Sequence, residues 1–86
     1  MNGAELLTEF RQRRSESAFE QLVRRYTDLV FSVAKRRLNS ETLAQEAAQS
    51  VFLRLASAAP KLPSEPALFG WLHRTTVHVS IDLWRT

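Results

Sequence analysis

The stretch that decides the fold is residues 18–38, AFEQLVRRYTDLVFSVAKRRL. Its apolar residues recur at the three- and four-residue spacing of one helix face, which predicts a helix from Ala18 to Leu38. The face consists of Phe19, Leu22, Val23, Tyr26, Val30, Val33 and Ala34, widened by Leu29 and Phe31. Because the apolar stripe is wide, we expect this helix to be the central one.

Both ends of this helix carry expected end signals. Ser17 followed by Glu20 matches a capping box, so the sequence predicts that the helix begins directly after Ser17. The run 35–37, Lys-Arg-Arg, lies in the last turn, where cations interact favourably with the helix dipole. That structural role is sufficient to explain the basic run.

Two further helices are predicted on either side. Residues 4–13 form a short one with Leu6, Leu7 and Phe10 on a single face. The pair Asn39-Ser40 reads as a turn and N-cap, and a helix is expected over 41–58. Its predicted buried face is Leu43, Ala47, Val51 and Leu55, with Ala48 and Phe52 alongside, and its polar face carries Gln45, Glu46, Gln49 and Arg54.

Residues 59–66 hold all three prolines and are predicted to form the one obvious loop. Ser64 is a plausible N-cap, with Pro66 in the first turn of a last helix running from Ala67 toward Thr86. The predicted apolar stripe of that helix is Leu68, Trp71, Leu72, Thr75, Val79 and Leu83. Trp71 is therefore expected to pack in the core, and Trp84 to be half exposed.

Composition favours one compact all-α domain, a bundle of about four helices. There is no cysteine, which excludes disulfides and thiolate zinc sites and is compatible with a reducing cytoplasm. No apolar run is long enough to span a membrane, and residues 1–14 do not read as a signal peptide. The net charge of +3, with ten arginines among twelve basic residues, is compatible with nucleic-acid binding and equally with an ordinary solvated surface.

No catalytic constellation is visible in the sequence. The two glycines are isolated, so there is no phosphate-binding loop. His73 and His78 are five residues apart and do not share a helix face as a metal pair would. Glu5 and Glu9 lie on an exposed face of the first helix. We expect neither enzymatic activity, nor a metal, nor a cofactor.

Three segments, in the same order, resemble region 2 of the sigma-70 family, most closely its extracytoplasmic-function (ECF) group. Residues 18–26, AFEQLVRRY, resemble the usual AFEELVRRY. Residues 44–55, AQEAAQSVFLRL, resemble AED..QEVFLRL. Residues 68–74, LFGWLHR, with Ile81, Asp82 and Arg85, look like F.AWLYRIARN...D..RR. The likeness covers residues 16–85, and three matches in register are far more specific than any one of them.

The resemblance implies a function that involves no catalysis by the chain itself. In this family the third helix docks on the clamp coiled coil of the largest subunit of core RNA polymerase, which would involve Gln45, Glu46, Gln49 and Arg54. The loop and last helix capture an unpaired base of the −10 promoter element and help to melt the duplex. The residues that would contact this single-stranded DNA are Lys61, Leu62, Ser64, His73, Arg74, His78 and Arg85. An anti-sigma factor is a third candidate partner, and the expected location is the cytoplasm, at the nucleoid during initiation.

The chain also departs from the family pattern. Acidic residues are usual where this chain has Leu43, Gln45 and Ser50, and the family's Arg-Asn pair in the last helix is replaced at 77–78 by Val-His. We therefore expect weaker charge-based polymerase docking and a different promoter preference. The helix-turn-helix domain that reads the −35 element in this family is absent from residues 1–86, which we interpret as a single region 2 domain.

Other functions remain open at this stage. A helical interaction module without DNA binding, either a degenerate sigma paralogue or a domain devoted to an anti-sigma partner, is favoured by the departures. A helix-turn-helix duplex binder is disfavoured, because the predicted eight-residue linker exceeds the 3–4-residue turn of that motif. A small helical enzyme comes last, for want of an acid–base or nucleophile set.

Overall fold

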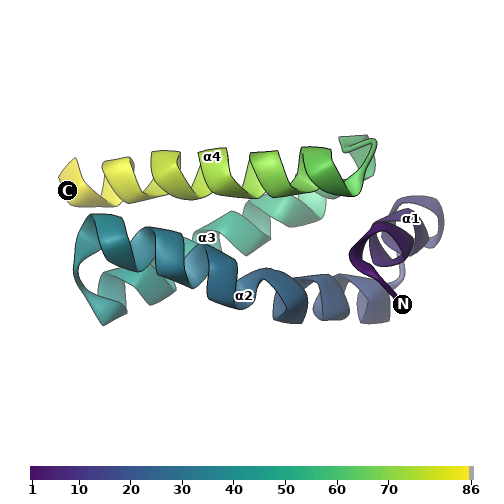
Figure 1. Cartoon of the computed structure of the whole chain (residues 1–86), viewed down its shortest axis with the longest axis horizontal. Coiled ribbons are helices and arrows are strands. Elements are labelled where there is room, and N and C mark those ends of the chain that lie inside the picture. The colour runs from purple at the N-terminus through teal and green to yellow at the C-terminus, as the bar shows by residue number, and fades with distance from the viewer. Residues whose placement is uncertain (86) are drawn as a thin grey trace.

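The computed structural model describes residues 1–85, and all regular structure in that part of the chain is helical (Figure 1). The elements are α1 (Gly3–Arg13), α2 (Glu16–Leu38), α3 (Glu41–Ala58), a 3₁₀ turn η1 (Ala59–Lys61) and α4 (Glu65–Arg85). In an elongated molecule of 37 × 19 × 17 Å, α2 and α4 run in one direction, α3 runs back behind both of them in the view of Figure 1, and α1 crosses one end. The expected all-α bundle of four helices is confirmed.

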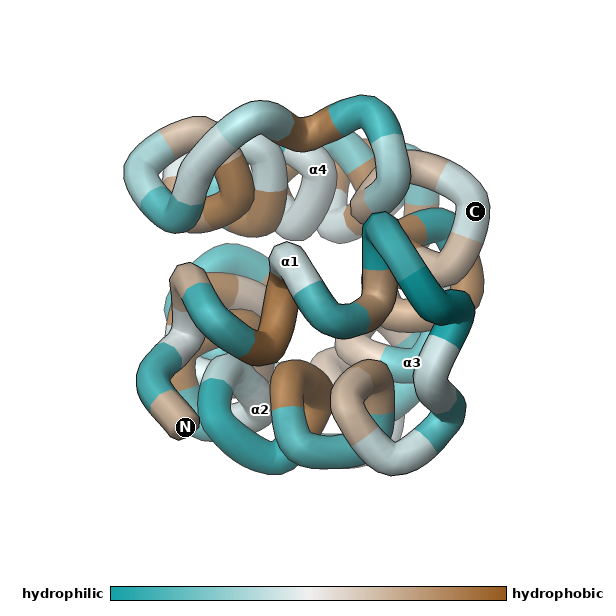
Figure 2. Tube along the Cα trace, turned by 90° about the vertical axis from the view of Figure 1, so that its right-hand side faces the viewer, coloured by the Kyte–Doolittle hydropathy of each residue, from teal (hydrophilic) through white to brown (hydrophobic). Residues whose placement is uncertain are grey.

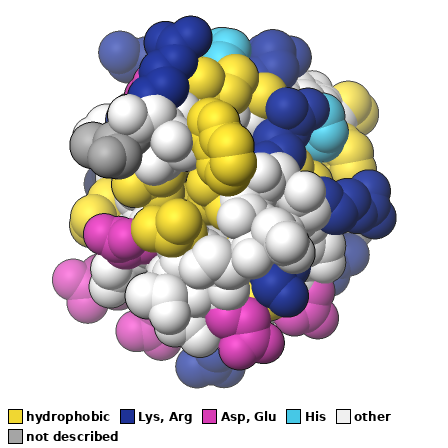
Figure 3. Space-filling view, turned by 90° about the vertical axis from the view of Figure 1, so that its left-hand side faces the viewer, with side chains coloured by type: hydrophobic (Ala, Val, Ile, Leu, Met, Phe, Trp, Pro, Cys, Tyr) yellow, Lys and Arg dark blue, Asp and Glu magenta, His cyan; other side chains and the backbone are white. Residues whose placement is uncertain are grey.

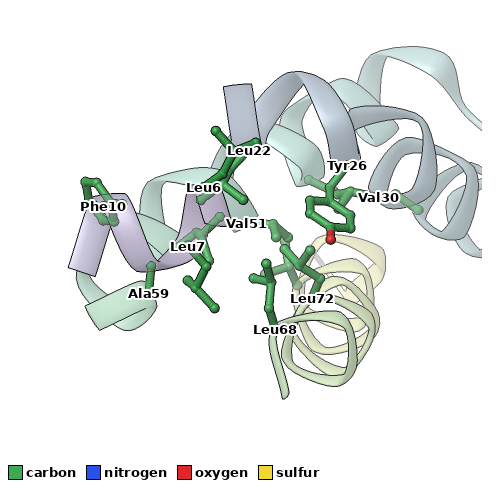
Figure 4. Close-up of a cluster of buried hydrophobic side chains, with 14 of the residues drawn as sticks. Leu6, Leu7, Phe10, Leu22, Tyr26, Val30, Val51, Ala59, Leu68 and Leu72 are labelled. Carbon is green, nitrogen blue, oxygen red and sulfur yellow. The ribbon is translucent and has the colours of Figure 1, made fainter. Parts of the chain in front are cut away.

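The α2 helix is central, as expected, because α1, α3 and α4 all pack against it. Figure 2 looks along the bundle from the end that α1 closes. Every fourth residue of α2 is buried, starting from Ala18 and including Leu22, Tyr26 and Val30. From α1, the predicted residues Leu6, Leu7 and Phe10 complete one side of the core (Figure 4).

Small residues let α2 and α3 approach closely. Ala34 on α2 and Ala44 and Ala47 on α3 are fully buried, and interhelical distance depends on the side chains at the contact. One residue of the predicted buried face of α3 is less buried than expected. Leu43 is only half-buried, because the buried face of α3 runs through Ala44 one position later.

The predicted start of α2 is also wrong. Arg14 adopts a left-handed backbone conformation (φ 53°, ψ 36°) that ends α1, and its guanidinium lies over the Phe10 ring. Ser15 is then extended and caps α2 by accepting a hydrogen bond from the Ala18 backbone N–H at 3.1 Å. Capping at Ser15 brings Ala18 into the core inside the first turn, whereas Ser17 only accepts a bond from the Gln21 side chain.

The proline-rich segment is less irregular than predicted. Pro60 fits the start of the 3₁₀ turn η1, and Pro66 sits in the first turn of α4, where its missing N–H costs no hydrogen bond. Only residues 62–64 are therefore irregular, instead of the predicted 59–66. Ser64 caps α4 as predicted, accepting from the Ala67 backbone N–H at 3.2 Å.

The α4 helix begins two residues before the predicted start, and its expected end at Thr86 lies outside the described residues. Its buried stripe contains two polar side chains that the prediction left out, Thr76 and Ser80, while the predicted Thr75 is only half-buried. The Thr76 hydroxyl donates to the Leu72 carbonyl at 2.6 Å, which satisfies it inside the core. Trp71 packs against the core from a half-buried position, and Trp84 is 71% exposed. Within residues 1–85 no helix is both long and apolar enough to cross a membrane.

Candidate nucleic-acid and protein interfaces

The segment between α3 and α4 is fixed from several sides. The Leu62 backbone N–H donates to the Ala59 carbonyl at 3.1 Å, and the Leu62 side chain packs against the core. From α1, the Arg11 guanidinium lies 3.5 Å from the Pro63 carbonyl, to which it donates. Lys61 and Ser64 stay exposed on this supported segment. Of the predicted DNA contacts, Leu62 packs against the core and Ser64 caps α4, while Lys61 is exposed and makes no ion pair within residues 1–85.

The first residue of α4 joins three helices. The Tyr26 hydroxyl of α2 donates to Glu65 Oε2, and Figure 4 shows it directed toward α4. Arg25 Nε lies 3.8 Å from the same oxygen. Gly3 of α1 closes the cluster: a Cβ there would lie 1.7 Å from Glu65 Oε2 and 2.8 Å from the Tyr26 hydroxyl. The cluster of Gly3, Arg25, Tyr26 and Glu65, which we call the Glu65 latch, fixes where α4 begins.

The latch should be visible in a titration of Tyr26. Burial, with the hydrogen bond to Glu65 and the charge of that carboxylate, raises the pKa of Tyr26 from 10.0 to about 12, against a smaller lowering by Arg25. Tyr26 is the one tyrosine of the chain, so phenolate absorbance reports it alone. We expect the titration midpoint of the Tyr26 phenol to lie near pH 12 in the folded protein and near pH 10 in denaturant.

The raised pKa of Tyr26 determines how the stability of the fold changes with pH. Below pH 10 the hydroxyl is protonated in both states and its contribution is complete. Between about pH 10 and 12 the unfolded chain releases the proton first, so stability falls by about 2–3 kcal/mol. The Tyr26→Phe variant should lack this component of the alkaline loss. A folded-state midpoint near 10 would show that the latch is open in solution.

The exposed side of α4 carries several cations and one acid, Asp82. Arg74, His78 and Arg85 share one face through spacings of four and seven residues, and all three are exposed. His73 is also exposed, about a quarter turn round the helix toward α2. No carboxylate occurs between Pro66 and Ile81. Asp82 lies on the same face beside His78 and Arg85, so the uncompensated positive charge is confined to the part of the face around Arg74.

Gly70 leaves space for the guanidinium of Arg74. A Cβ at Gly70 would lie 3.1 Å from Arg74 Nη1, so the guanidinium folds back along α4 toward its N-terminal end. The ion pairs seen within residues 1–85 join Arg13 to Glu9, Arg24 to Glu20 and Arg25 to Glu65, and none of them involves Lys61 or Arg74. Both cations are thus available to an anionic ligand near the anchored loop.

An open groove of about 780 Å³ lies beside the latch, between α2 and the start of α4. Its lining includes Arg25 and Leu29 from α2, with Pro66 and Phe69 from α4. Phe69 is 50% exposed, unusual for a phenylalanine on a helix that packs against two others. The groove combines apolar side chains, an accessible aromatic ring and the ion pair of Arg25 with Glu65.

The four predicted polymerase contacts are all exposed but occupy two neighbouring faces of α3. Gln45 and Gln49 share one face, which the 73% exposed Leu53 continues at the same four-residue spacing. Glu46 and Arg54 instead line a shallow hollow together with Ser50 of α3 and with Val79, Asp82 and Leu83 of α4. The structure therefore extends the candidate surface from α3 onto α4.

Several of these features were missed by the sequence reasoning. Tyr26 was assigned to the apolar stripe, and Glu65 had no assigned role, because their contact spans 39 residues. The pairing of α3 with α4 around Glu46 and Arg54 likewise needs tertiary structure. Leu53 had a usable signal, since it is a leucine on the polar side of an otherwise regular helix.

Together these surfaces describe the class of the protein, a small helical module with one basic and one mixed polar face. Residues 22–86 match the family model described as sigma-70 region 2. The chain therefore belongs to the sigma-70 family, and the ECF group is the part of it that it resembles most.

A curated relative agrees with this assignment. Over 69 residues the chain is 30% identical to the ECF RNA polymerase sigma factor SigE of Mycolicibacterium smegmatis (strain ATCC 700084 / mc(2)155). The aligned part is 79% of this chain and 26% of that protein, so the chain spans about a quarter of its relative's length. No solved structure matches the chain.

Proposed function

We propose that this chain is the region 2 module of a sigma factor, which docks on core RNA polymerase and opens the −10 promoter element by binding one unpaired strand. Membership of the sigma-70 family supports the general role. The observation that carries the finer role is the anchored segment 62–64, which leads into a stretch of α4 that exposes Arg74 and has no carboxylate between Pro66 and Ile81. The place of action is the cytoplasm, where polymerase and chromosome lie.

The geometry suits an extruded base. A loop held by Leu62, Arg11 and the Ser64 cap is already ordered, so little conformational entropy is lost when it grips a nucleotide. Lys61 and Arg74 are placed to hold phosphates, and the groove at Phe69 offers a ring for stacking. Binding to such a base favours the open over the paired promoter, which is how a non-catalytic module can promote melting.

The test compares single-stranded DNA sequences. A non-template oligonucleotide with a −10-like sequence should bind more tightly than a scrambled one of equal length, measured by fluorescence anisotropy at several salt concentrations. A purely electrostatic binder would hold both equally and lose both in parallel with salt. Equal affinities for a panel of −10-like and scrambled strands would overturn the proposed recognition.

The docking face on α3 is proposed to contact the clamp coiled coil of the polymerase. Glu46 is the remaining acid of the family's patch, and it lies beside Arg54 and the α4 residues of the shallow hollow. The Glu46→Arg variant should weaken capture of core polymerase by the domain, because reversing a rim charge costs electrostatic complementarity. Its affinity for the −10-like strand should stay unchanged. Undiminished capture of polymerase would remove Glu46 from the docking face.

A second function is favoured by one observation, the apolar Leu53 on the exposed face of α3. An interaction module devoted to another protein, such as an anti-sigma factor, would use such a residue as an anchor. That reading predicts that Leu53→Ala weakens binding of a protein partner and that the domain captures no polymerase. Capture of purified core polymerase by the isolated domain separates the two functions.

A further inference from the structure

A second hollow lies on the seam between α2 and α4, at the end opposite the loop. It measures about 210 Å³ and is lined by Arg37 of α2 and by Ser80, Ile81 and Trp84 of α4. Trp84 is 71% exposed and Ile81 36% exposed, so two large apolar side chains face solvent beside a cation. Figure 3 shows this end of the molecule, with hydrophobic side chains near its centre and basic ones along the upper and right-hand rim.

The hollow also contains a polar group without a partner. Ser80 is 1% exposed, and its hydroxyl has no hydrogen bond within residues 1–85. One turn earlier Thr76, equally buried, satisfies its hydroxyl on the Leu72 carbonyl, so the contrast lies within one helix. An unpaired buried hydroxyl costs stability, so a ligand that enters the hollow and reaches the Ser80 side chain would relieve that cost.

The two ends of the seam share an arginine of α2 and an exposed ring of α4, but Arg25 is paired with Glu65, while no ion pair of Arg37 is seen within residues 1–85. Near the loop, an arginine of α2 (Arg25) meets an exposed ring of α4 (Phe69); at the far end, Arg37 meets Trp84. The two rings are 15 residues apart on α4, or about 22 Å along the helix axis. Exposed rings alternating with cations along a surface track are the usual means of holding single-stranded nucleic acid.

We propose that the hollow of Arg37, Ser80, Ile81 and Trp84, which we call the Trp84 hollow, binds a second unpaired base of the strand that the loop engages. The inference rests on the proposed function, because it extends the same strand along α4. Trp84 stacks on the base, the Ser80 hydroxyl bonds to its edge, and Arg37 holds a flanking phosphate.

The basic residues around the Trp84 hollow favour a nucleic acid over a protein as its ligand. Arg36 and Arg37 lie in the last turn of α2 and Arg85 follows Trp84, so cations outnumber the nearby acid, Asp82, and phosphates would neutralise the excess. Its small volume suits one flat ring better than the several side chains of a docked helix. Adjacent exposed cations without an ion pair, such as Arg36 and Arg37, lose little on binding an anionic strand.

The test uses two fluorescent 12-mers, one of thymidines and one with the same phosphates but no bases. Trp84→Ala should weaken binding of the thymidine strand at least about fivefold, and up to about 150-fold, the range measured for one stacked base. Its binding of the abasic strand should not change. Trp84→Phe should restore most of the affinity, because it keeps a ring. Leu53→Ala, an equally exposed apolar residue on α3, is the matched control and should have no effect.

Ser80→Ala gives a second, independent readout. Removing the unpaired hydroxyl should raise the melting temperature by about 4–8 °C while lowering affinity for the thymidine strand. A merely structural serine would move both quantities in the same direction or neither. The intrinsic fluorescence quenching expected when the thymidine strand binds should be lost in Trp84→Phe, which ties the signal to that ring.

The outcomes separate this inference from the proposed function. If the wild-type domain binds neither strand, both fail. If it binds and loss of Lys61 and Arg74 weakens it, but Trp84→Ala behaves like Leu53→Ala, only the Trp84 hollow is wrong. Equal losses on both strands would exclude base stacking. Unchanged strand binding with weaker capture of polymerase would assign the hollow to a protein partner and overturn the proposal.

Discussion

The Leu68→Ala variant is expected to lose about 2–5 kcal/mol of unfolding free energy, the range for a leucine truncated in a packed core. Leu68 is fully buried in the first turn of α4. Figure 4 shows it gathered with Leu7 of α1, Val51 of α3 and Leu72 of its own helix. A domain of this size holds only several kcal/mol in total, so this one change should bring it close to the unfolding threshold.

The chain supplies its own control for this experiment. Leu53→Ala makes the same chemical change on a leucine that is 73% exposed, and it should alter stability by no more than about 0.5 kcal/mol. Urea denaturation followed by far-UV circular dichroism measures both variants. Similar losses in the two variants would mean that Leu68 is not in a close-packed core, and the bundle as described would be wrong.

The same variant links the core to the proposed site. Leu68 lies directly behind residues 62–64 and one turn from the Glu65 latch, so the loop cannot hold its position if this contact is lost. Strand binding by Leu68→Ala should therefore fall even at temperatures where the domain remains mostly helical. The loop is an ordered ligand site only because the α1, α2 and α4 core supports it.

The sequence predicted most of the fold because helix periodicity is a local signal. Leu22, Tyr26 and Val30 are in the core as the apolar stripe of residues 18–38 indicated. The errors lie where two local signals compete or where packing decides. Ser15 and Ser17 are both good N-caps, and only the burial of Ala18 selects the first. The predicted stripe of α4 includes Thr75 and leaves out Thr76 and Ser80, but α4 packs against both α2 and α3, so its buried face extends to these two residues.

For the candidate sites, the sequence predicted which residues are exposed but not which of them lie together. Exposure of charged residues such as Arg74 and Glu46 follows from helix phase, and the sequence placed them outside the core correctly. Which of them lie together is a tertiary property. Glu46 meets α4 in the shallow hollow while Gln45 does not, and nothing in the spacing of α3 alone reveals this. Roles in binding for all of these residues remain predictions.

The double variant Lys61→Gln/Arg74→Gln is expected to bind a −10-like strand about 25-fold more weakly at 0.1 M salt. For single strands, each phosphate contact contributes about 0.7 to the slope of log affinity against log salt, so two lost contacts reduce it by about 1.4. The loss should shrink steadily as salt approaches 1 M, because it arises from counterion release. Both side chains are exposed and unpaired, so the melting temperature should not change.

Net charge alone could mimic this result, and the chain offers a variant that removes the ambiguity. Arg13→Gln/Arg24→Gln also takes the net charge from +3 to +1, but these arginines lie on α1 and α2, paired with Glu9 and Glu20. If the loop and α4 hold the strand, this control keeps nearly the full salt slope. Equal slopes for the two double variants would mean that the strand senses only the overall charge. A loss at Lys61 and Arg74 that persists undiminished at 1 M salt would instead locate their effect in the shape of the loop, because screening removes an electrostatic contact but not a structural one.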